Sequence, residues 1–201
     1  MKSSISRTLR IFEEHYQPIP LEVYGADPYK TLVSTLLSAR TRDETTFAVC
    51  EKLFKKARNF RELAKLSQGE LEKFLHPVGF YKTKAKNLKK AAEILVTKYN
   101  GKVPDNITAL IALPGVGRKT ANLVLARAFG QDAISVDTHV HRVSNTLGWV
   151  NTKRPEQTEQ ELMKIIPRGK WKHVNRLVVS IGRQYRSNKQ LEHFLRENQL
   201  I

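Results

Sequence analysis

Apolar residues recur with helical spacing along nearly the whole chain. Near the start they lie at i, i+4, i+7 and i+11, namely at Ile5, Leu9, Phe12 and Tyr16, a pattern typical of an amphipathic helix. A nearly continuous apolar helix is expected after Pro28, and the helical period returns in residues 84–99, 155–166 and 171–185. The only extended stretch is short, residues 133–136. Because such a chain must bury helix against helix, the sequence predicts an all-α fold.

The charge balance favours a polyanionic partner. The 201 residues include 35 Lys and Arg against 19 Asp and Glu, a formal net charge of +16, and nucleic acid is the obvious counterpart. The alternative is a solvated basic surface. We expect that alternative to hold for most of the lysines crowded into one predicted helix, which are Lys82, Lys84, Lys86, Lys89, Lys90 and Lys98.

Two compositional features exclude other classes of protein. No apolar run approaches about 18 residues and the N-terminus lacks a signal-peptide core, so we expect a soluble, cytoplasmic protein without a membrane partner. The single cysteine, Cys50, excludes an internal disulfide or an all-cysteine metal site in this chain. Its spacing with Phe47, Leu53 and Phe54 predicts a place in the core.

Local signals mark two helix boundaries. Ser67 and Glu70 have the spacing of a capping box. Further along, either Asp105 or Asn106 can begin a helix that runs through Leu113.

The segment LPGVGRKTA at residues 113–121 breaks that helix, and a second one is expected over residues 118–129. Gly115 and Gly117 allow positive φ and close backbone approach, so N–H groups of the hairpin and of the second helix can point outward. Such a helix start is an anion site that suits a DNA phosphate. The GxxxxGK[ST] spacing of nucleotide-binding loops is absent. The alternative is a simple glycine turn.

Lys119 gives the hairpin a chemical role. It lies in the first turn of the second helix, where the helix dipole and Arg118 both disfavour an ammonium charge. A neutral lysine can attack a sugar carbon and form a Schiff base. The helix rises about 15 Å and residues 130–136 span up to about 23 Å, so the chain can return Asp137 to the same place. Asp137 is expected to cap the next helix, and its carboxylate can also stabilise a sugar cation or receive a proton.

The stretch LPGVGRKTANLVLARAFG followed by VDTHVHRV strongly resembles the helix-hairpin-helix DNA glycosylases of the endonuclease III group. The similarity extends to LLSARTRDETT at residues 36–46, VGFYKTKAKN at 78–87 and IGRQY at 181–185, about nine tenths of the chain. The resemblance implies two lobes with a DNA cleft between them. One is a six-helix bundle of roughly residues 21–131, and the other combines residues 1–20 and 132–201.

The resemblance also implies the chemistry. Lys119 takes the position of the Schiff-base nucleophile and Asp137 that of the aspartate essential for base excision. The expected protein is a monomeric bifunctional glycosylase and abasic-site lyase for oxidised pyrimidines in duplex DNA, associated with the nucleoid. One alternative is a mismatch uracil or thymine glycosylase, and a second is a non-catalytic helix-hairpin-helix module.

The C-terminal segment departs from the family pattern. Relatives usually carry four cysteines for an iron–sulfur cluster, whereas GRQYRSNKQLEHFLRENQLI has none. We expect no cluster and no catalytic metal, although the resemblance allows a monovalent cation at the hairpin. A short helix is expected to pack instead through Leu191, Phe194 and Leu195. Any DNA contacts that the cluster loop would make are lost with it, and the candidates to compensate are Arg183, Arg186 and Lys189.

The candidates for holding the duplex open are Arg40 and Phe80. Arg40 replaces the glutamine that relatives use to fill the gap opposite an extruded base, and its alternative role is a phosphate contact. Phe80 follows a glycine between helices and is a candidate wedge, unless it packs beneath its own loop. The full set of DNA-binding candidates is Arg40, Phe80, Gly115, Val116, Gly117, Arg118, Thr120, His139 and Arg142.

Overall fold

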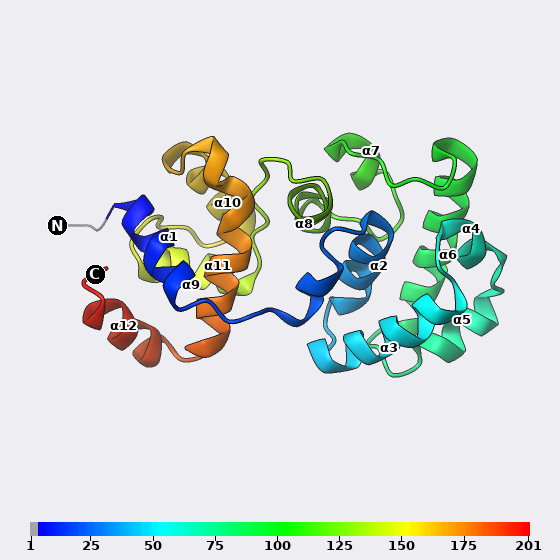
Figure 1. The fold of residues 1–201 in the computed structure, drawn as a ribbon, viewed down its shortest axis with the longest axis horizontal. Helices are drawn as coiled ribbons and strands as arrows, with labels where there is room; N and C mark the ends of the chain where they lie inside the picture. Colours follow the sequence, from blue (N-terminus) through cyan, green and yellow to red (C-terminus); the bar gives the residue numbers. More distant parts are fainter. Residues whose placement is uncertain (1–3) are drawn as a thin grey trace. The chain divides into compact units, whose positions relative to one another are not determined.

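The computed structural model describes residues 4–201, and within this range the chain forms helices and no strands (Figure 1). The all-α prediction is therefore confirmed. Two compact units are present. The central unit is Pro20–Phe129, and the terminal unit joins the described residues up to Ile19 with Gly130–Ile201.

In the central unit, a buried helix organises the others. Its elements are η1 (Pro20–Tyr24), α2 (Pro28–Ser38), α3 (Asp43–Lys56), α4 (Phe60–Lys65), α5 (Gln68–Leu75), α6 (Tyr81–Tyr99), α7 (Ile107–Ile111) and α8 (Arg118–Ala128). Helix α2 packs against α3, α6 and α8, while α6 also carries α4 and α5. Leu32, Val33 and Leu37 of α2 have no exposed surface. The continuous apolar run after Pro28 therefore forms a helix buried on several sides, as predicted.

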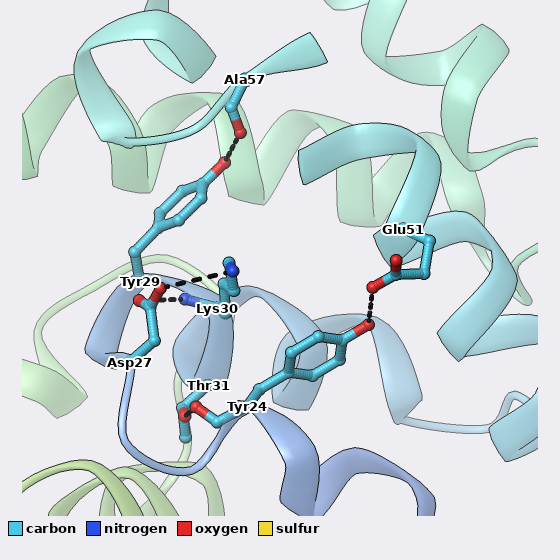
Figure 2. Close-up of polar contacts among 7 residues, drawn as sticks. All are labelled: Tyr24, Asp27, Tyr29, Lys30, Thr31, Glu51 and Ala57. Carbon is cyan, nitrogen blue, oxygen red and sulfur yellow. Dashed lines mark hydrogen bonds and ion pairs between the residues drawn. The ribbon is translucent and has the colours of Figure 1, made fainter. Parts of the chain in front are cut away.

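Buried polar side chains tie η1 to α2 and α3 (Figure 2). The Tyr29 hydroxyl donates to the Ala57 carbonyl at 2.6 Å, and the Thr31 hydroxyl donates to the Tyr24 carbonyl at 2.6 Å. The Tyr24 hydroxyl donates to Glu51 at 2.8 Å. Burial raises the pKa of both tyrosines above the ordinary value, so each stays a neutral donor and the start of α2 is held in place.

Cys50 lies in the core of the central unit, as predicted, and burial raises the pKa of its thiol to about 12. A thiol that stays protonated is neither a nucleophile nor a ready metal ligand. Phe47, on the same helical face as Cys50, is less deeply buried and remains 37% exposed. One face of its ring stacks on Tyr24, with centroids 5.9 Å apart, so Phe47 covers the edge of the core.

In the terminal unit, α11 lies against both α1 and α9, and α12 packs on α9. The elements are α1 (Ile5–Glu14), α9 (Thr138–Thr146), α10 (Pro155–Ile165), η2 (Arg168–Lys170), α11 (Trp171–Gln184) and α12 (Asn188–Glu197). The predicted last helix is present with Leu191, Phe194 and Leu195 buried. The Phe194 ring stacks on Tyr185, with centroids 4.4 Å apart.

Local capping signals place several helix boundaries correctly. Ser67 and Glu70 form the predicted capping box. Asn106, one of the two candidates, caps α7 by accepting from the Ala109 N–H at 2.9 Å. Helix α7 ends at Ile111, before the predicted Leu113, because the Leu113 N–H bonds to the Leu110 carbonyl in a tighter turn. Among residues 4–201, no helix has the length and apolar character needed to cross a membrane.

Candidate functional site

The hairpin between α7 and α8 leaves the start of α8 without a side-chain cap. Gly115 has φ +82°, a left-handed conformation that favours glycine, and an added Cβ would lie 3.1 Å from the Asn87 amide nitrogen. Val116 is buried and fastens the loop. Gly117 is the N-cap with φ −91°, so of the two glycines that allow positive φ only Gly115 adopts it. First-turn N–H groups without a side-chain cap suit an anion.

Lys119 lies on the exposed side of α8. The opposite side of this helix is fastened in the core by Ala121 and Val124, which have no exposed surface. Arg118 is exposed beside Lys119, and Thr120 is half-buried. The packing of α8 therefore fixes which side chains its first turn presents to solvent.

Asp137 is the N-cap of α9, as predicted, and its carboxylate accepts from the Val140 N–H at 2.8 Å. Buried Ile134 and Val136 anchor the segment that leads to it. The carboxylate is half-buried and fixed in orientation. A carboxylate held at a helix start can stabilise a positive charge that develops nearby. Asp137 belongs to the terminal unit, whereas Lys119 belongs to the central unit.

Two other candidates of the terminal unit have packing roles. The His139 ring covers Gly182, where an added Cβ would lie 2.9 Å from the His139 Cβ. The Arg142 guanidinium donates to the carbonyls of Gly182 and Tyr185 at 2.9 and 2.8 Å. Burial lowers the pKa of Arg142 below its usual range. Its contacts join α9 to the C-terminal end of α11, where a cation is favoured by the helix dipole.

Arg40 and Phe80 lie on two loops of the central unit that touch each other. Both have left-handed backbones, with φ +53° and +57°. The Arg40 guanidinium carbon lies 5.4 Å from the centroid of the Phe80 ring, within cation–π range. Gly79 permits the close approach, because an added Cβ would lie 2.6 Å from the Arg40 carbonyl oxygen. The two loops therefore present Arg40 and Phe80 as a pair.

A cavity of about 310 Å³ opens beneath this pair. It is lined by Leu36, Ala39, Arg40, Phe80, Thr83, Lys84, Asn87, Leu88 and Gly115. Phe80 is 62% exposed, which excludes packing beneath its own loop. The structure thus brings three candidates, Arg40, Phe80 and Gly115, to one cavity.

Sequence reasoning missed Lys84 at this cavity. Lys84 and Lys89 are half-buried, whereas the other four crowded lysines are exposed. Burial lowers the pKa of Lys84 to about 8. Its position four residues before buried Leu88 signals an inward face, but the density of lysines in this segment obscured the signal.

The C-terminal segment does not fit an iron–sulfur cluster. Residues 186–201 contain no cysteine, and thiolates are the ligands such clusters need. The apolar side chains of α12 are already committed to the core. Among residues 4–201, no group of three or more His, Cys, Asp and Glu side chains is arranged to hold a metal ion.

Residues 33–168, more than half of the chain, match the family described as HhH-GPD superfamily base excision DNA repair protein. The chain belongs to this superfamily. The match extends far beyond the hairpin, so the similarity is not confined to an isolated helix-hairpin-helix unit.

Named relatives place the chain in the endonuclease III-like branch of the HhH-GPD superfamily. Endonuclease III of Thermotoga maritima is 48% identical over 158 residues, which cover 79% of this chain and 74% of the relative. The mouse endonuclease III-like protein 1 is 38% identical over 159 residues, or 78% of this chain. The matched part spans about half of that longer protein, 53%.

Solved structures agree with this placement. A non-covalent endonuclease III–DNA complex matches with a TM-score of 0.85 and 35% identity, covering 97% of this chain and 95% of that one. A trapped endonuclease III–DNA covalent intermediate matches with a TM-score of 0.80 and 34% identity, covering 91% and 86%. The HhH-GPD fold is therefore shared along almost the full length of the chain.

Proposed function

We propose that the protein is a monomeric bifunctional DNA glycosylase and abasic-site lyase that removes oxidised pyrimidines from duplex DNA. The observation that carries this proposal is Lys119, exposed in the first turn of α8 directly after the hairpin. Lysine is the residue type needed for a Schiff base with a sugar. The endonuclease III relative trapped as a covalent intermediate with DNA supports the same chemistry.

The hairpin and the start of α8 bind the DNA backbone in this proposal. Peptide N–H groups at the start of α8, which has no side-chain cap, donate to a phosphate, and exposed Arg118 adds a positive charge. The formal net charge of +16 favours the approach of DNA and makes binding weaken as salt rises. This framework positions one nucleotide relative to Lys119.

The reaction begins with extrusion of the damaged nucleotide. The lone pair of the Lys119 amine forms a bond to the anomeric carbon, and the base leaves with the electrons of the glycosidic bond and takes a proton from solvent. The Asp137 carboxylate stabilises the sugar cation that develops and receives the proton that the amine loses. Opening of the sugar ring gives the imine. Loss of a proton from the adjacent 2′ carbon then expels the 3′ phosphate by β-elimination.

Phe80 holds the gap open, so Phe80→Ala should lower excision from paired lesions about tenfold more than excision from single-stranded DNA. Extrusion costs a few kcal/mol, and a wedge offsets part of this cost only when the base was stacked and paired. The melting temperature should change little because the ring is 62% exposed. Parallel kinetics on both substrates provide the measurement, and equal losses would show that Phe80 is not a wedge.

The chain folds without iron in this proposal. Purified protein should lack the visible absorption of a cluster and contain no stoichiometric iron by elemental analysis. Iron bound at one cluster per chain would contradict this result.

In place of a cluster, the buried Phe194 side chain of α12 stabilises the terminal unit. Phe194→Ala should lower the free energy of unfolding by about 3–5 kcal/mol, because a buried aromatic side chain is removed. Denaturant unfolding measures the change, with exposed His193 mutated to alanine as the control.

A lesion panel tests the proposed activity. Duplexes carrying oxidised pyrimidines, an abasic site, or uracil or thymine opposite guanine are incubated with the protein, and strand cleavage is compared with release of the free base. Efficient release and 3′ cleavage at oxidised pyrimidines support the proposal. Excision restricted to uracil or thymine mismatches would favour the mismatch glycosylase, and binding without release from any substrate would favour the non-catalytic module.

A further inference from the structure

Lys84 uses its ammonium group to hold one turn of the backbone. Its Nζ donates to the Leu37 carbonyl at 2.7 Å, to the Thr41 hydroxyl at 3.1 Å and to the Ala39 carbonyl. An ammonium group has three donors. All three are therefore directed to oxygens at the end of α2 and in the turn that follows it.

The turn needs such support. Leu37 lies in the last turn of α2 and Ala39 is its C-cap, so these carbonyls lie at the negative end of the helix, where a cation is favoured. The next residue, Arg40, has φ +53°. A left-handed conformation is unfavourable for an arginine and persists only when its surroundings hold it.

The same lysine reaches the second loop through Thr41. The Thr41 hydroxyl oxygen accepts from the Lys84 Nζ and also from the Gly79 N–H, at 3.1 Å in each case. Gly79 immediately precedes Phe80. Lys84, Thr41 and Gly79 thus connect the backbones on which both members of the Arg40–Phe80 pair stand.

We propose that Lys84 is a positioning residue that locks the Arg40 turn to the Phe80 loop and thereby sets the preference for the base opposite the lesion. The inference rests on the proposed function and on the sequence-based hypothesis that Arg40 fills the gap opposite the extruded base. An arginine held in one orientation donates to guanine O6 and N7 and discriminates against adenine. Lys84 acts on this choice through the backbone and contacts no DNA.

Lys89 provides a matched comparison on the same helix. It is also half-buried, its Nζ also donates to a carbonyl, that of Ala64, and it lies 3.4 Å from the Glu93 carboxylate. It does not border the cavity. Loss of Lys89 therefore reports the general cost of removing a half-buried lysine from α6.

The protonation of Lys84 supplies a second readout. Burial lowers its pKa to about 8, so at higher pH the amine loses one of its three donors. The titratable groups that border the cavity are Arg40 and Lys84 themselves. Helix α2, the hairpin and the first part of α6 contribute apolar or uncharged residues there, which are Leu36, Ala39, Leu88, Gly115, Thr83 and Asn87.

The experiment compares Lys84→Met, Lys84→Arg and Lys89→Met on duplexes with one oxidised pyrimidine opposite each of the four bases. Lys84→Met should lower the preference for guanine about tenfold, the size expected when a hydrogen-bonded charge is removed. Wild type should lose the preference as pH rises through about 8, whereas Lys84→Arg should keep it. Lys89→Met should behave as wild type.

Two measurements separate this inference from the proposed function. Borohydride trapping on single-stranded abasic DNA depends on Lys119 and should be unchanged in Lys84→Met. The Gly79 amide should exchange hydrogen at least about tenfold faster in Lys84→Met than in Lys89→Met, because the Thr41 acceptor is no longer held. Unchanged base preference and unchanged Gly79 exchange would overturn the inference. Failure of wild type to form an adduct, with Gly79 exchange altered as expected, would instead remove the proposed function and the base-selection role that rests on it.

Discussion

Lys119→Gln is expected to abolish the borohydride-trapped adduct and lower base excision by at least about 10³-fold. Glutamine retains hydrogen-bonding atoms at the same helix position but has no nucleophilic amine. Binding to abasic-site DNA should remain, because the hairpin N–H groups and Arg118 are unchanged. Trapping, single-turnover excision and a binding titration on the same oligonucleotide provide the measurement.

Arg118→Gln is the matched control for charge. It removes one positive group from the same helix start and should therefore weaken DNA binding. The salt dependence of the binding constant should fall by the amount expected for the loss of about one phosphate contact. At saturating protein it should still form the adduct. Both residues are exposed on α8, so both variants should unfold within about 0.5 kcal/mol of wild type. Full trapping by Lys119→Gln would contradict the assignment of the nucleophile.

Asp137→Asn is expected to lower base excision about 10²–10³-fold while lesion binding is kept. The amide is nearly isosteric but carries no negative charge, so it neither stabilises the sugar cation nor takes the proton from the attacking amine. Single-turnover excision on a lesion duplex measures the loss. An abasic-site substrate should be affected less, because no base has to leave.

The comparison with Asp137→Ala separates chemistry from folding. Asparagine is as good an N-cap as aspartate and should still accept from the Val140 N–H. Alanine lacks the cap and should lower the free energy of unfolding by about 1 kcal/mol. Both variants should lose excision to a similar extent. If Asp137→Asn excised bases at the wild-type rate, Asp137 would have no catalytic role and would serve only as the N-cap of α9.

The parts of the fold that depend on local sequence were predictable. Ser67 and Glu70 form a capping box and Asp137 caps α9 because each cap needs only residues three positions apart. The helical spacing of apolar residues predicts α12 and the burial of Leu191 and Phe194, and this prediction needs no information on which helices lie next to α12. The hairpin was visible for the same reason, since Pro114 and the glycines break a helix wherever they stand.

The parts that depend on distant contacts were not predictable. Position 79 must be glycine because the Arg40 carbonyl oxygen leaves no room there for a Cβ. The Lys84 ammonium donates to oxygens of Leu37 and Thr41, which lie more than 40 residues earlier in the sequence. The spacing of apolar residues along the chain does not predict such contacts between distant segments. Phe47 illustrates the same limit. Helical spacing indicates which face of α3 is apolar, but it does not show that Phe47 lies at the edge of the core, stacked on the ring of Tyr24.

Mapping of the trapped adduct identifies the nucleophile. Wild-type protein is incubated with an oxidised-pyrimidine duplex and borohydride, digested, and sequenced by tandem mass spectrometry. We expect a reduced sugar remnant on Lys119 and on no other residue. An adduct on another amine, such as Lys84, or base release without any adduct, would contradict it.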